Sequence, residues 1–186
     1  HQKIEIVVNG WSEAGGNYIS VFTGNKGTDV GSGTGMLVNA LNQHFERYLR
    51  DGKIGIPVGV RSLGIALPEK CEAYHSGISL LLAIENMQAI ERMYNGNNLN
   101  DSPGIGLDDH LVGIGAADLD NSIKQQIDNT LSALQSLSDP LSENIINNPT
   151  QVEAAYAEMQ KLIVLFKVDM PSRLGVLITY QDNDGD

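Results

Sequence analysis

Apolar side chains recur every three or four residues along the second half of the chain, which is the spacing of a helix with one buried face. One such stripe covers residues 119–141 and another covers 152–170. The pair Asp139-Pro140 predicts a break and a restart near the end of the first stripe. Asn148 is expected to be the N-cap of the second helix, with Gln151 as its capping-box partner.

Two more helices are predicted in the first half of the chain. Residues 36–50 place leucine, phenylalanine and tyrosine at helical spacing, and Asp51-Gly52 is a typical C-terminal stop. Pro68 suits the first position of another helix, which is expected to run to Tyr94. The middle of this second helix is apolar on nearly all sides, as in a helix buried at the centre of a bundle.

Glycine, asparagine and proline are concentrated between these segments, which predicts loops. The expected loops cover about residues 9–35, 51–67 and 95–107. Short helical turns fit around residues 4–8 and 18–22, and Pro171 is expected to kink or end the last helix. The only segment with strand-like composition has no partner strand. The predicted fold class is therefore all-α, with residues 1–186 forming a single domain, an antiparallel helical bundle with long ordered loops.

The charge balance excludes two classes of partner. Lys and Arg number 12 against 23 Asp and Glu, which gives a formal net charge of −11. A surface this acidic disfavours nucleic acid, because phosphate binding needs a basic face, and it equally disfavours an anionic lipid surface. No apolar run is long enough to predict a transmembrane segment. Composition alone does not indicate an activity.

Most candidate motifs are incomplete. No two histidines lie four residues apart, so there is no His-Glu-x-x-His zinc helix. Asp182, Asp184 and Gly185 match positions of a calcium-binding EF-hand loop, but Tyr180 stands at the first position, where aspartate belongs. This spacing favours a solvated acidic terminus. The glycine-rich residues 31–35 lack the Gly-Lys-Ser/Thr that a phosphate-binding loop requires.

Positive charge is concentrated in one stretch of this acidic chain. Four of the 12 basic residues lie among 21 positions, and they are Arg50, Lys53, Arg61 and Lys70. Such a basic, glycine-containing stretch could hold a carboxylate or phosphate ligand, or dock on an acidic partner domain. The third alternative is that it only packs against its own bundle.

Four segments, in chain order, together carry a resemblance to a known family. They are Gly27-Thr28-Asp29, then Arg50-x-x-Lys53-x-Gly55-Ile56-Pro57-x-Gly59, then Pro68-Glu69-x-x-Glu72-Ala73-Tyr74-x-Ser76-x-x-Ser79, and finally Leu174-Gly175-Val176-x-Ile178-Thr179-Tyr180-x-Asp182-x-Asp184-Gly185-Asp186. With them the chain resembles the C-terminal half of imelysin-family proteins.

The resemblance implies a largely α-helical protein built from two bundle-like halves, located in the periplasm or anchored at the outer membrane as a lipoprotein. It also implies a peptidase-like protein that cleaves insulin, or a relative active in iron uptake. The family's Gly-x-His-x-x-Glu motif is absent from this chain. The chain is then either a C-terminal portion, whose partner is its own N-terminal half, or a complete protein without the motif. Its length and its start at His1 favour a portion.

The resemblance also suggests which residues line a cleft between the two halves. The candidate ligand-binding residues are Arg50, Lys53, Glu72, Tyr74 and Ser76. Glu72 would be the acid–base or metal-directed group, and Arg50 and Lys53 would clamp an anion. The candidate metal ligands, for a divalent ion such as iron or calcium, are Glu72, His75, Asp182 and Asp184.

Three functions follow from these expectations. The first is an exported protein that provides one wall of a metal- or ligand-binding cleft, for example in iron uptake. The second is a metallopeptidase whose catalytic half is absent here. The third is a structural or partner-binding helical domain without chemistry of its own.

Overall fold

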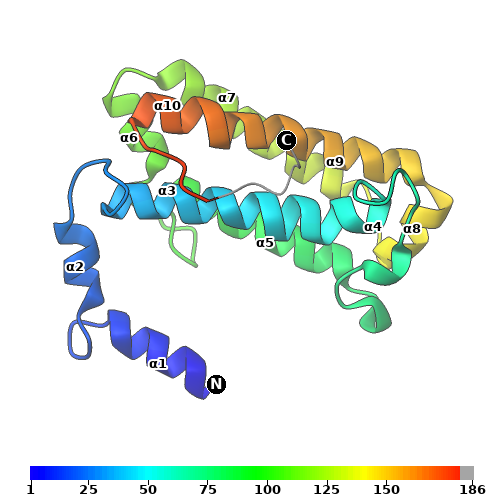
Figure 1. Cartoon of the computed structure of the whole chain (residues 1–186), viewed down its shortest axis with the longest axis horizontal. Helices are drawn as coiled ribbons and strands as arrows, with labels where there is room; N and C mark the ends of the chain where they lie inside the picture. The colour runs from blue at the N-terminus through cyan, green and yellow to red at the C-terminus, as the bar shows by residue number, and fades with distance from the viewer. Residues whose placement is uncertain (181–186) are drawn as a thin grey trace.

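Helices account for the regular structure of residues 1–180, the part of the chain that the computed structural model describes. No strand forms among those residues, which confirms the predicted all-α class. Figure 1 shows long helices lying side by side, with a short helical arm at the N-terminus. Every helix in the described part of the chain is too short or too polar to pass through a lipid bilayer.

Long helical rods form the bundle, and two of them contain a π-helical stretch. The first rod joins α3 (Gly33–Gln43), the π-helix η1 (His44–Gly55) and α4 (Ile56–Val58). The middle rods are α5 (Ser79–Tyr94) and α7 (Ala117–Gln135). The last rod joins α9 (Pro149–Val164), the π-helix η4 (Leu165–Asp169) and α10 (Met170–Leu174).

Shorter elements precede the first rod and connect the later ones. The N-terminal arm holds α1 (Gln2–Trp11) and α2 (Tyr18–Gly24), so the short helical turns expected there are present. Two 3-10 turns, η2 (Pro68–Lys70) and η3 (Tyr74–Ser76), precede α5. The remaining connectors are α6 (Leu107–Gly113) and α8 (Leu141–Asn147), and α8 is the restart predicted after Asp139-Pro140.

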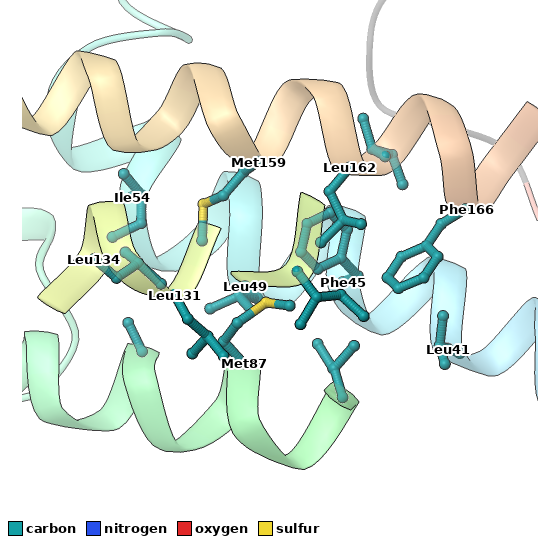
Figure 2. Close-up of a cluster of buried hydrophobic side chains, with 14 of the residues drawn as sticks. Leu41, Phe45, Leu49, Ile54, Met87, Leu131, Leu134, Met159, Leu162 and Phe166 are labelled. Atoms are coloured by element: carbon teal, nitrogen blue, oxygen red, sulfur yellow. The ribbon is translucent and has the colours of Figure 1, made fainter. Parts of the chain in front are cut away.

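The core lies where the rods meet, and it is mostly aliphatic. Figure 2 shows side chains from every rod pointing into one cluster. Its fully buried members include Phe45, Leu49, Met87, Leu134, Met159, Leu162 and Phe166. The rings of Phe45 and Phe166 meet edge to face, with centroids 5.6 Å apart, and so join the first rod to the last.

The helix predicted to stop at Asp51-Gly52 continues to Val58, so the expected loop at 51–67 begins eight residues later. Ile54 and Val58 are buried, and burial of these side chains favours a continued helix over the local stop signal. The rod ends at Gly59, whose φ of 102° is a left-handed conformation that glycine adopts without strain.

The helix predicted from Pro68 to Tyr94 starts only at Ser79. Ala73 and Gly77 have φ values of 53° and 66°, and such left-handed residues interrupt a right-handed helix. The amides of Leu80 and Leu81 donate to the carboxylate of Asp139, at 2.8 and 2.9 Å. A side chain from a distant loop therefore caps α5.

Two expectations about the last rod need correction. Asn148 stands at the N-cap position of α9, but its side chain makes no capping hydrogen bond. Of the two outcomes expected at Pro171, the end of the helix is wrong, because α10 continues to Leu174. The π-helix η4 ends at Asp169, and Pro171 is the second residue of α10.

Candidate functional site

A polar pocket opens on the side of the first rod. Its volume is about 590 Å³, which is within the range of small-molecule sites. The lining residues are His44, Tyr48, Gly52, Lys53, Glu72 and Asn86. They come from η1, from the segment between the two 3-10 turns, and from α5. We refer to this cavity as the η1 pocket.

The π-helical winding of η1 explains why His44 and Lys53 line the same pocket. They are nine positions apart. Nine residues make about two and a half turns of an α-helix, which would place the two side chains on opposite sides of the rod. A π-helix has hydrogen bonds from i to i+5 and about 4.4 residues per turn, so nine residues make about two turns. His44, Tyr48 and Lys53 therefore share one face.

Lys53 and Glu72 form an ion pair in the η1 pocket. The Lys53 side chain is only 13% exposed, whereas that of Glu72 is 49% exposed. Burial lowers the pKa of Lys53, because desolvation disfavours its charged form. The backbone beside the carboxylate is also held, since the hydroxyl of Ser79 donates to the carbonyl of Glu72. The pair therefore presents a sequestered ammonium beside an accessible carboxylate.

His44 and Asn86 make a second polar contact in the same pocket. His44 Nε2 lies 2.9 Å from Asn86 Oδ1. An amide oxygen can only accept, so Nε2 donates, and in the neutral imidazole Nδ1 is left as an acceptor. The ring of Tyr48 packs near the imidazole, with centroids 5.7 Å apart. The η1 pocket thus combines hydrogen-bond donors and acceptors with an aromatic face.

Among the candidate residues from the sequence, Lys53 and Glu72 are brought together here. Tyr74, His75 and Ser76 lie on η3, and none of them lines the η1 pocket. The rings of Tyr74 and His75 pack edge to face, with their centroids 5.3 Å apart. The Ser76 hydroxyl donates to the carbonyl of Ala73 at 3.0 Å.

Arg50 occupies a different place from the one expected for an anion clamp. It is 2% exposed and lies inside the bundle. Its guanidinium is 3.6 Å from a carboxylate oxygen of Glu46, donates to the hydroxyl of Tyr156 at 3.4 Å, and also donates to Gln160. Since Arg50 follows Glu46 by four residues on η1, the two side chains share the inner face, opposite the η1 pocket.

The candidate metal ligands do not form a cluster in the described residues. Within residues 1–180, no three His, Cys, Asp or Glu side chains are grouped so that they could hold a metal ion. Glu72 is paired with Lys53, and His75 packs against Tyr74. Asp182 and Asp184 lie outside the described residues.

Sequence reasoning missed His44, Tyr48 and Asn86 as pocket residues. The spacings of four and five residues from His44 to Tyr48 and then to Lys53 match one face of a π-helix. That signal is visible only once π-helical winding is considered. Asn86 carries no comparable signal, because its position in the pocket depends on how α5 packs against η1.

One comparison with known proteins gives a match. A family model described as Imelysin matches residues 1–166, a range that includes every residue lining the η1 pocket. No curated protein and no solved structure matches the chain.

Proposed function

The chain belongs to the imelysin family, and from that premise we propose that it forms one wall of a ligand-binding cleft in an exported protein. The η1 pocket is the proposed binding surface. The observation that carries this proposal is the convergence of Lys53, Glu72 and His44, from two distant segments, in a cavity of about 590 Å³. The other wall is proposed to be an N-terminal half of the same protein.

The ligand that suits the η1 pocket is a polar organic molecule with an anionic group. The Lys53 ammonium is largely withdrawn from water, so an anion that reaches it gains a strong, charge-assisted hydrogen bond. The same ammonium repels a bare metal cation from Glu72. In iron uptake, the role suggested for this family, the pocket would accordingly hold the metal as a complex with an anionic chelator.

Binding of citrate, used as an anionic probe, tests the proposal. Amide NMR signals of residues 44–53 and 72 are expected to shift saturably as citrate is added. Lys53→Met removes the charge while keeping the length of the side chain, and it is expected to abolish those shifts.

Lys70→Met is the matched control, because Lys70 is exposed on η2 and does not line the η1 pocket. It is expected to leave the citrate response unchanged. The proposal is wrong if citrate causes no saturable shift in the pocket, or if the same shifts persist in Lys53→Met.

A further inference from the structure

The pair of Lys53 and Glu72 offers a ligand both signs of charge on neighbouring atoms. Its contact with Glu72 takes one of the three hydrogen-bond donors of the Lys53 ammonium. On the carboxylate side the same contact uses only Oε2. The other oxygen belongs to a side chain that is 49% exposed and lines the η1 pocket. The pair can therefore bind an anion and a cation without coming apart.

The neighbouring contact between His44 and Asn86 has the same mixed character. The imidazole donates from Nε2, which makes Nδ1 an acceptor in the neutral ring. The contact uses the oxygen of Asn86, whose NH2 group carries two donors. Both residues line the same cavity as the ion pair. The wall of the η1 pocket thus has a second donor and a second acceptor for groups that bind at Lys53 and Glu72.

A ligand with a single charge meets repulsion at this ion pair. A cation on Glu72 lies close to the Lys53 ammonium, and an anion on Lys53 lies close to the Glu72 carboxylate, so in each case part of the attraction is lost. A molecule with both charges on neighbouring atoms places each one beside its opposite, and the four groups then alternate in sign. An α-amino acid has this arrangement, because its ammonium and its carboxylate are attached to the same carbon.

We propose that the η1 pocket recognises the head group of an α-amino acid: the ligand carboxylate accepts from Lys53, and the ligand ammonium donates to Glu72. This inference rests on the proposed function, since it names the class of ligand for the same pocket. Tyr48 is 59% exposed and lines the cavity, so its ring offers a surface for an apolar side chain of the ligand. The volume of about 590 Å³ leaves room for such a side chain.

L-Phenylalanine and two derivatives test the inference at about pH 7, where an α-amino group is mostly charged. N-acetyl-L-phenylalanine keeps only the negative charge, and L-phenylalanine amide keeps only the positive charge. In calorimetric titrations the free amino acid is expected to bind about tenfold more tightly than either derivative, since each derivative loses one charge-assisted hydrogen bond. Saturable shifts of the amide NMR signals of residues 44–53 and 72 would locate the binding in the η1 pocket.

Glu72→Gln is the decisive variant, because it removes the negative charge and keeps the size of the side chain. The preference for L-phenylalanine over N-acetyl-L-phenylalanine is expected to disappear in this variant. Glu69→Gln is the matched control, since Glu69 is exposed on η2 and does not line the η1 pocket, and it should keep the preference.

A Glu72 that only stabilised the fold would give a different result. Its replacement would lower the free energy of unfolding and leave the ratio of the two affinities unchanged. That result, or equal binding of L-phenylalanine and its N-acetyl derivative to the unaltered protein, would overturn the inference.

The two proposals fail in different ways. If citrate shifts the pocket signals but L-phenylalanine binds no more tightly than its N-acetyl derivative, the proposed anion site stands and the amino-acid inference falls. If L-phenylalanine binds in the η1 pocket with the expected preference and citrate does not bind, the inference stands and the chelator proposal falls. If neither probe moves the pocket signals, both are wrong.

Discussion

Single polar groups inside this bundle depend on specific partners. Tyr94 is fully buried, and its hydroxyl donates to Asp120 at 2.8 Å. Burial, together with the hydrogen bond to Asp120, raises the pKa of Tyr94 above its ordinary value. Lys124 bonds the other oxygen of the same carboxylate at 3.0 Å. The tyrosine thus helps to satisfy a carboxylate that is only 4% exposed.

Tyr94→Phe is expected to destabilise the protein by about 2 kcal/mol, because it leaves a buried, charged acceptor without one of its donors. Chemical denaturation would measure the change. Tyr74→Phe provides the comparison, since Tyr74 is 44% exposed and should tolerate loss of its hydroxyl. Equal effects of the two substitutions would contradict the assignment.

Deprotonation of the Cys71 thiol is expected to lower the free energy of unfolding in alkaline solution. Burial, followed by the charges of Asp139 and Glu69, raises the pKa of its thiol from 9.0 to about 11. Between those two values the unfolded chain loses the proton while the folded chain keeps it. The free energy of unfolding therefore falls as pH rises through this window.

Denaturation curves at several pH values from 8 to 11 would detect the fall, and Cys71→Ala should remove the part due to the thiol. The same burial makes the folded thiol unreactive toward a maleimide at pH 8, whereas the denatured chain should react. Rapid labelling of the folded protein would argue against a buried, protonated Cys71.

At the scale of elements, the start of α5 depends on a contact from outside the helix. Ile78 stands at the N-cap position of α5, and its aliphatic side chain cannot accept a hydrogen bond from the first helix amides. Asp139 supplies the missing acceptor for the amides of Leu80 and Leu81 and places a negative charge at the positive end of the helix dipole. The α7–α8 connection and α5 are therefore coupled.

Asp139→Ala is expected to cost about 1 kcal/mol, the usual effect of removing a helix cap. Faster hydrogen exchange of the first turn of α5 would localise the loss. Asp128→Ala removes an exposed aspartate from the middle of α7 and should leave both measurements unchanged.

The elements differ in how far the sequence could predict them. The helices α7 and α9 follow directly from their apolar stripes, because each buries one continuous face. The π-helix η1 could not be predicted in this way, since Asp51-Gly52 is a good local stop and burial of Ile54 and Val58 overrides it. The family resemblance, together with residue chemistry, predicts Lys53 and Glu72 as cleft residues, but their meeting with His44 and Asn86 depends on winding and packing.

For the whole molecule, the N-terminal arm and the bundle contribute unequally to stability. No residue of α1 is buried, and its Ile4, Ile6 and Val8 are more than 60% exposed. In Figure 1 the arm projects away from the packed rods. The buried residues of the hydrophobic core begin at Val38 and all lie after the N-terminal arm.

Deletion of residues 1–11 is therefore expected to change the free energy of unfolding of the bundle by less than about 0.5 kcal/mol. Denaturation followed by helical circular dichroism would measure it, with the Tyr94→Phe variant as a reference for real destabilisation. A large loss after the deletion would mean that α1 packs on the bundle in solution.

Two hydrogen bonds join Asn39 of α3 to Leu177 and Thr179, which lie 138 and 140 positions further along the chain. Contacts of such long range are expected to form late, because the entropy cost of closing a large loop must be met before the contact stabilises the fold. During synthesis α3 and η1 leave the ribosome well over a hundred residues before Tyr180 does. The first rods can thus begin to assemble before residues 177–179 pack against α3.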